Sequence, residues 1–189
     1  MKYIFIFLFI LSCLPNLGLT QSQYIKRHES GILLSGGLLN SKNQTVKNYQ
    51  VGISINGIFD LGFSYATPPS LKSIFLTMYP GKDIKGRAVQ PILHISHLIL
   101  DDKVSGYSIG LGAYKKISLS EIELYPAITA SYSSLSNDDY TLISAVGATI
   151  SLDVALKSPD LRLILSPIWT ITQNGNGIGL ALGLSFNFH

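Results

Sequence analysis

Large apolar residues recur at every second position over most of the chain beyond residue 30, and turn-forming residues separate these segments. The final segment is the clearest, because Ile, Leu or Phe alternates with Gly, Ala, Ser or Asn from Ile178 to Phe188. Successive side chains of a β-strand point to opposite faces. A period of two therefore predicts strands that carry one apolar face and one face of small residues.

The same alternation occurs in four other segments: Tyr49 to Ile55, Ile58 to Ala66, Ser105 to Tyr114 and Leu142 to Val154. Asn56-Gly57 lies between the first two of them. Both residue types tolerate the positive φ that a type I′ hairpin turn requires. The sequence therefore predicts a tight β-hairpin at this point.

Three segments resemble one another: PILHIS (91–96), PAITAS (126–131) and PIWTIT (167–172). We interpret them as equivalent strands of a repeating hairpin, with each proline near a strand end, since proline cannot donate to a ladder. The whole pattern predicts ten strands, with eight as the alternative. The ten cover about residues 31–40, 49–55, 58–67, 70–79, 88–100, 105–115, 121–133, 141–155, 161–172 and 177–188.

Composition favours lipid rather than water around these strands. Of the 189 residues, 47% are hydrophobic and only 13% are charged, about half the usual charged share of a soluble domain. Small residues suit the inside of a narrow barrel, and tilted strands of about ten residues span a bilayer. Lipid offers no hydrogen-bond partners, so such a sheet must close on itself. We predict an all-β fold, a single antiparallel up-and-down transmembrane β-barrel; a soluble, secreted lipid-binding barrel is the alternative.

The first residues are typical of an export signal. Lys2 precedes an apolar stretch from Tyr3 to Leu11, which is too short to span a bilayer. We predict a signal peptide over residues 1–20, cleaved after Thr20, and a barrel domain over 21–189. An uncleaved membrane anchor is one alternative. In another, Cys13 is the lipidated N-terminus, because Ile10 to Cys13 resembles a lipobox. Cys13 is the one cysteine, so cleavage after Thr20 leaves no disulfide.

Aromatic residues are expected at both rims of a membrane barrel. The strand directions place Phe59, Phe186 and Phe188 near one rim. They place four tyrosines near the other: Tyr65, Tyr107, Tyr132 and Tyr140.

With its signal peptide, its alternating strands and its final GLALGLSFNF, the chain resembles the small outer-membrane β-barrel proteins of Gram-negative bacteria. This resemblance implies an outer-membrane location and a C-terminal aromatic residue that the assembly machinery reads. Phe188 fills that role one position early, because His189 follows it. The expected partners are the outer-membrane bilayer and this machinery, and we expect a monomer. Basic residues are scattered and the net charge is only +3, so no nucleic-acid partner is expected.

His94 and Ser96 are the candidates for chemistry, because residues two apart share one face of a strand. A His that deprotonates a Ser is the core of acyl-transfer catalysis. The pair resembles the His-x-Ser of outer-membrane lipid A deacylases, but His97 stands where that family has Asn, and no acidic partner is evident. In that family the pair faces lipid, whereas the register here turns His94 and Ser96 inward, and Pro91, Leu93, Ile95 and His97 outward. We therefore expect no catalytic residue, no metal site and no cofactor.

Five charged residues within or beside strands are candidates to point into the lumen: Asp60, Glu121, Glu123, Asp153 and Arg162. They either pair there and plug the barrel or line a narrow pore. The sequence thus predicts an integral outer-membrane barrel with a structural or interaction role and no catalysis. The alternatives are a small pore or passive transporter, and a lipid-modifying barrel enzyme that uses His94 and Ser96.

Overall fold

The computed structural model describes residues 23–41, 44–68, 70–82, 88–100, 104–136, 141–158, 160–172 and 175–188. The predicted signal peptide, Cys13 and Tyr140 lie outside these ranges. In the described part of the chain, no helix is long and apolar enough to cross a membrane. The strands are β1 (Ser30–Ser41), β2 (Gln44–Ile55), β3 (Phe59–Thr67), β4 (Leu71–Met78), β5 (Gln90–Ile99), β6 (Ser105–Tyr114), β7 (Ile117–Ser118), β8 (Ile122–Ser136), β9 (Thr141–Leu156), β10 (Leu161–Thr172) and β11 (Gly175–Phe188).

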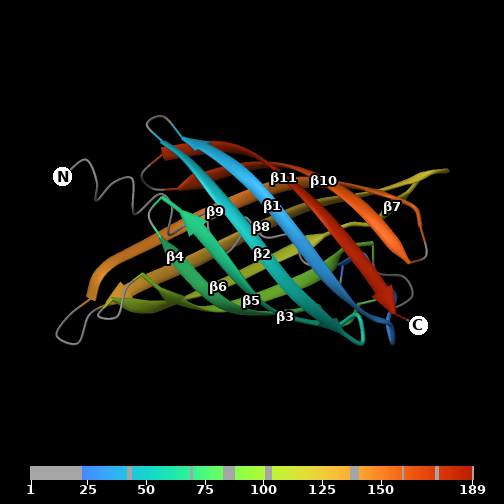
Figure 1. Ribbon diagram of the computed structural model, residues 1–189, viewed down its shortest axis with the longest axis horizontal. Coiled ribbons are helices and arrows are strands. Elements are labelled where there is room, and N and C mark those ends of the chain that lie inside the picture. Colours follow the sequence, from blue (N-terminus) through green and yellow to red (C-terminus); the bar gives the residue numbers. More distant parts are fainter. Residues whose placement is uncertain are drawn as a thin grey trace.

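Ten of these strands form one closed antiparallel barrel (Figure 1). Each of them pairs with its neighbour in sequence, β11 pairs with β1, and β6 pairs with β8 across the short β7. The strand β7 only extends the start of β8 through two residue pairs. The predicted all-β, up-and-down, ten-strand barrel is confirmed, and the alternative of eight strands is wrong.

An even strand number brings both ends of the barrel domain to one rim, since Ser30 pairs with Phe188. We call this rim the terminal end and the opposite rim the loop end. The connections at the loop end are short: they cover residues 42–43, 68–70, 100–104, 137–140 and 173–174. The longest connection, residues 79–89 between β4 and β5, lies at the terminal end.

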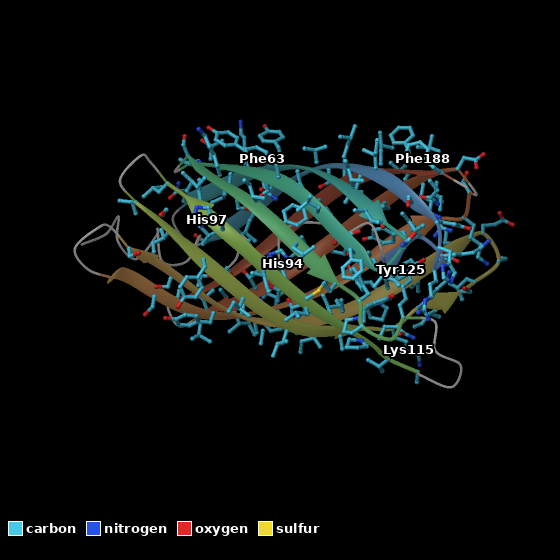
Figure 2. All side chains as sticks on the ribbon, turned by 90° about the horizontal axis from the view of Figure 1, so that it is seen from below. Phe63, His94, His97, Lys115, Tyr125 and Phe188 are labelled. Carbon is cyan, nitrogen blue, oxygen red and sulfur yellow. The ribbon has the colours of Figure 1, made fainter. Side chains whose placement is uncertain are left out.

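The outer surface of the barrel is apolar. Along β2, β3, β6, β9 and β11 the predicted apolar faces point outward, and their large side chains are exposed. Figure 2 shows Phe63 and Phe188 on this surface. Phe59, Phe186 and Phe188 lie toward the terminal end and Tyr65, Tyr107 and Tyr132 toward the loop end, as predicted. An apolar exterior of this kind is suited to lipid, and the fold is a transmembrane β-barrel.

The hairpin between β2 and β3 turns at Asn56 and Gly57, whose φ values are 55° and 61°. The amide of Ile58 donates to the carbonyl of Ile55 over 3.1 Å and closes the turn. Both central residues adopt the left-handed region that a type I′ turn requires, so this prediction is confirmed.

Two predicted details of the strands are wrong. Strand β2 begins at Gln44 rather than at about residue 49, because the polar stretch Gln44 to Asn48 continues the ladder with β1. Pro167 lies in the middle of β10 and not near a strand end. It pairs with Leu180 of β11, while Ser166 and Pro167 have no partner residue in the β9 ladder. The lost donor therefore interrupts pairing on one side only.

Candidate functional site

The lumen of the barrel is the candidate site, because it gathers the buried polar and charged side chains. At its terminal end, four tyrosines pack together. Tyr24 meets Tyr125 edge-on with ring centroids 5.1 Å apart, and Tyr79 and Tyr114 meet likewise at 5.7 Å. Apolar residues complete this aromatic cluster: Leu33, Ile92, Ala155 and Ile164. Its members come from six strands around the barrel and from the segments beside β1 and β4, so the cluster crosses the lumen.

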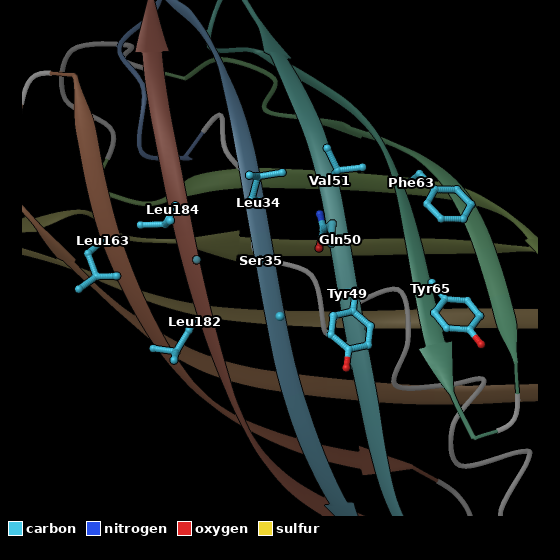
Figure 3. Close-up of a pocket in the computed structure, with 12 residues that line it drawn as sticks. Leu34, Ser35, Tyr49, Gln50, Val51, Phe63, Tyr65, Leu163, Leu182 and Leu184 are labelled. Atoms are coloured by element: carbon cyan, nitrogen blue, oxygen red, sulfur yellow. The ribbon is translucent and has the colours of Figure 1, made fainter.

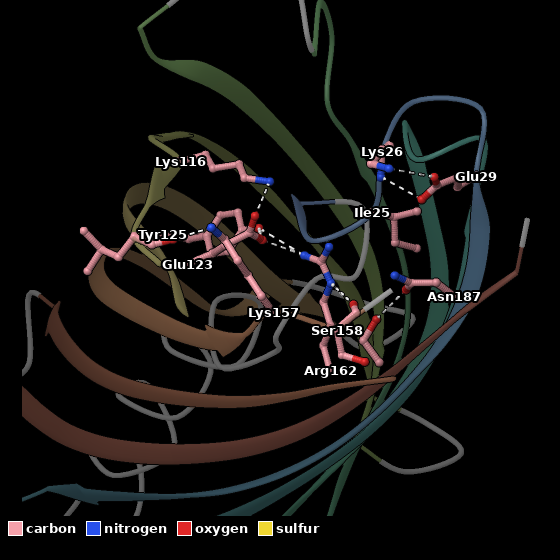
Figure 4. A network of polar contacts seen from close by, with 12 residues as sticks. Ile25, Lys26, Glu29, Lys116, Glu123, Tyr125, Lys157, Ser158, Arg162 and Asn187 are labelled. Carbon is pink, nitrogen blue, oxygen red and sulfur yellow. Dashed lines mark hydrogen bonds and ion pairs between the residues drawn. The ribbon is translucent and has the colours of Figure 1, made fainter. Parts of the chain in front are cut away.

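A buried ionic network joins the aromatic cluster (Figure 4). Glu123 accepts from Arg162 Nη1 at 2.7 Å, from Lys116 Nζ at 2.7 Å and from the Tyr125 hydroxyl at 2.6 Å. Arg162 Nε also donates to the carbonyl of Ser158 over 3.3 Å. The carboxylate thus receives two cations and one hydroxyl, which compensates for its removal from water.

Asp153 is another buried carboxylate of the lumen. The Tyr24 hydroxyl donates to it over 2.7 Å, and Gln23 and Ser166 donate as well. Burial raises the pKa of the Tyr24 hydroxyl well above its usual value. Tyr24 therefore stays protonated and remains a donor to Asp153.

The segment from Gln23 to Glu29 lies against the terminal end of the lumen. His28 N donates to the carbonyl of Asn56 over 2.9 Å, and Lys82 Nζ donates to the carbonyls of Ile25 and Gly57. Gln23, Tyr24 and Ile25 are each at most 5% exposed. Two residues separate this segment from the predicted signal peptide, and the segment packs into the terminal end together with Asp153.

A second cluster crosses the lumen at the loop end, and it is aliphatic. Eight strands contribute one buried residue each: Leu39, Val46, Ala66, Leu71, Leu98, Leu135, Ile168 and Ala181. Leu100 and Val104, between β5 and β6, pack against it. Buried side chains therefore meet across the lumen at two levels.

Between the two clusters the lumen is polar and contains small residues. Hydroxyl pairs link neighbouring strands, as Ser64 with Ser73 at 2.7 Å and Ser108 with Ser133 at 2.8 Å. The ring of Phe75 fills space beside Gly62, where a Cβ would lie 2.4 Å from Phe75 Cζ. Glycine on the inward face of β3 is thus required for this aromatic side chain to fit.

His94 and Ser96 both point into the lumen, as predicted, and His97 points outward (Figure 2). His94 Nδ1 bonds the hydroxyl of Thr77 at 2.8 Å, and its ring stacks on Phe75 at 5.8 Å. Among the described residues, Ser96 Oγ and His94 Nε2 have no hydrogen-bond partner. The two side chains therefore do not form a nucleophile–base pair, and both are buried away from lipid.

The predicted lumen charges are placed correctly in four cases. Asp60, Glu123, Asp153 and Arg162 are buried inside the barrel. The prediction is wrong for Glu121, which is exposed in the turn between β7 and β8. The side chain of Glu121 is exposed at this turn and does not enter the lumen.

Sequence reasoning did not find the tyrosines at positions 24, 79, 114 and 125 or the lysines at 82 and 116. Most of them lie at or beyond strand ends, where alternation gives no signal. In the described residues, no group of three or more His, Cys, Asp or Glu side chains is arranged to hold a metal ion.

No protein-family model matches the chain, and no curated protein matches it. Among solved structures, the N-terminal β-barrel domain of Pseudomonas aeruginosa OprF is 12% identical, with 87% of this chain and 100% of that chain covered and a TM-score of 0.44. Neisserial surface protein A is 13% identical over 85% and 96%, with a TM-score of 0.45. The β-domain of the Bordetella autotransporter BrkA is 11% identical over 85% and 99%, with a TM-score of 0.45. All three are outer-membrane β-barrel proteins.

Proposed function

We propose that the chain is an integral outer-membrane β-barrel protein with a closed lumen and a structural role, without catalysis. One observation carries this proposal: two clusters of buried side chains cross the lumen, one aromatic and ionic, the other aliphatic. A pore would need a continuous polar path, and its charged residues would face water. Here the charged groups of Glu123 and Arg162 pair with each other inside the barrel instead of facing water.

The membrane location is supported by the apolar exterior, the two aromatic rims and the even strand number. Export by a signal peptide over residues 1–20, and a monomeric barrel domain over residues 21–189, complete the proposal. The loop-end connections cover at most five residues each, which favours a structural role over recognition at the cell surface.

Two measurements on the full chain test this proposal. Closed membrane barrels resist detergent until they are boiled, so the protein in the outer-membrane fraction should change its gel mobility on heating. The purified barrel should give no stepwise conductance in a planar lipid bilayer, where an established porin prepared in parallel does. Recovery in the soluble periplasmic fraction would contradict the membrane location, and ion conductance would favour the pore.

Recognition of the last strand by the assembly machinery is part of the same proposal. Replacing Phe188 by Ala should lower the amount of heat-modifiable barrel in the outer-membrane fraction. Phe59→Ala is the control, because Phe59 is exposed at the same rim but is not in the last strand. Equal losses in both variants would indicate a general effect of the rim and not a sorting signal.

A further inference from the structure

The outward face of the barrel carries two charged side chains among the described strand residues. Four charged strand residues point inward: Asp60, Glu123, Asp153 and Arg162. The other two, Lys47 of β2 and Lys72 of β4, are exposed on the outside. A cation on the lipid face is costly at the bilayer midplane and tolerated near the interface. Both lysines lie near the loop end of their strands, within reach of lipid headgroups.

An apolar groove lies on the same side of the barrel (Figure 3). Its volume is about 580 Å³, and β1, β2, β3, β10 and β11 contribute to it. Gly36 lies in its floor, because it is the outward residue between Leu34 and Leu38 of β1 and has no side chain to fill the space. Tyr49 flanks it on β2 and Leu182 flanks it on β11. The groove thus has the apolar lining of a site for an acyl chain.

The two lysines lie at the loop-end edge of this groove. Lys47 is two residues from Tyr49 on the same face of β2. Lys72 is directly opposite Tyr65, whose hydroxyl lies 3.0 Å from Ser70 Oγ at the same end of the strand. In Figure 3 the hydroxyls of Tyr49 and Tyr65 point toward the end at which β3 terminates, which is the loop end. Tyrosines orient in this way where an apolar surface meets polar headgroups.

We propose that this face binds an anionic, phosphorylated lipid. Its acyl chain lies in the groove over Gly36, and its phosphate lies between Lys47 and Lys72, beside the hydroxyls of Tyr49 and Tyr65. Charge indicates the kind of lipid. Among the described strand residues, the outward face carries two lysines and no acidic residue, which suits an anionic headgroup. The inference rests on the membrane location proposed above and adds a specific ligand class to it.

The test uses the full chain, purified and reconstituted in lipid nanodiscs of phosphatidylcholine that contain a small share of bis-phosphorylated lipid A. Native mass spectrometry then measures how much lipid A the released barrel retains. The double variant Lys47→Gln/Lys72→Gln should retain it about 30-fold more weakly, at about fivefold per lysine. Lys115→Gln, an exposed lysine at the terminal end, is the control and should retain it like the original chain.

The groove has its own variant, Gly36→Leu, which fills the floor and should also weaken retention. Ala148→Leu adds similar bulk, three carbon atoms instead of four, to the outward face of β9 and should not weaken retention. The inference would be overturned if the lysine variant retained lipid A as well as the original chain does. It would also be overturned if the original chain retained phosphatidylcholine as well as lipid A. Inorganic phosphate is added as a competitor for lipid A. If it displaced lipid A as well as free lipid A does, the role of the groove would be overturned. A heat-dependent gel shift of the same sample shows that the barrel is folded. Recovery of the chain in the outer-membrane fraction tests the membrane location separately, so the two failures are distinguishable.

Discussion

Glu123 is the residue on which the terminal end of the lumen depends most. Its carboxylate is shared between Arg162, whose side chain is 10% exposed, and Lys116, whose side chain is 44% exposed. Removing a carboxylate that pairs with a buried cation leaves that cation uncompensated. Glu123→Gln should therefore lower the free energy of unfolding by about 3–5 kcal/mol, measured by urea titration in detergent micelles.

Lys116→Gln is the matched comparison, since it removes the other ion pair of the same carboxylate. Water screens a cation that is 44% exposed, so this change should cost less than about 1 kcal/mol. Similar losses in the two variants would show that burial of Arg162 is not what makes the network matter.

Gly62 and Gly52 face each other across β2 and β3, but only Gly62 leaves no room for a side chain. A Cβ at Gly62 would lie 2.4 Å from Phe75 Cζ and 2.5 Å from the carbonyl oxygen of Val51. At Gly52 the nearest atoms are 3.6 Å away, which is ordinary contact. Gly62→Ala should thus destabilise the barrel by about 1–3 kcal/mol, whereas Gly52→Ala should change stability by less than about 0.5 kcal/mol. Urea midpoints of the two variants check this, and a neutral Gly62→Ala would contradict the packing of Phe75.

At the scale of elements, alternation predicts the strands well where lipid covers them, because lipid requires an uninterrupted apolar face. The last strand follows this rule from Ile178 to Phe188. The start of β2 does not, since Thr45 and Lys47 point outward beyond the apolar part of the strand. The two residues of β7 pair with β8 alone and carry no periodic signal at all.

The lumen was predictable only in part for a related reason. Alternation along a strand shows which residues point inside, so four of the five charged residues predicted to face the lumen are correct. It does not show which of them meet, because a closed barrel brings Tyr24 and Asp153 together from 129 positions apart. Partners that approach across the lumen leave no spacing in the sequence.

Closure of the barrel depends on the pairing of β1 with β11, in which Ser35 is opposite Gly183. Both residues point into the lumen and are small. In a Cys13→Ser background, the pair Ser35→Cys/Gly183→Cys should be joined by a short bifunctional thiol reagent. The product should migrate faster than the uncrosslinked chain on a denaturing gel after boiling, since a closed loop of most of the chain is more compact.

Ser35→Cys/Leu184→Cys tests the register of this pairing, because Leu184 points outward from the next position of β11. This pair should stay uncrosslinked, since the sheet separates the two thiols. Cross-linking of this pair in place of the first would show a register shifted by one residue, which would also turn the apolar face of β11 inward.

At the scale of the whole molecule, the two clusters close one lumen in series. The aromatic cluster and its ionic network block the terminal end, and the aliphatic cluster blocks the loop end. The terminal end also binds the segment from Gln23 to Glu29, through Asp153 and Lys82. An ion that passes one cluster still meets the other.

This arrangement predicts that conductance appears only when both clusters are opened. Tyr24→Ala/Tyr125→Ala removes bulk at the terminal end, and Leu39→Ala/Leu98→Ala removes it at the loop end. Each pair alone should leave the barrel silent in a planar lipid bilayer, because the remaining cluster still excludes water. The combined variant should give stepwise currents, provided that its heat-dependent gel shift shows a folded barrel. Currents from either pair alone would mean that the other cluster does not seal the lumen, and a silent, folded combined variant would mean that the polar middle of the lumen is itself impassable to ions.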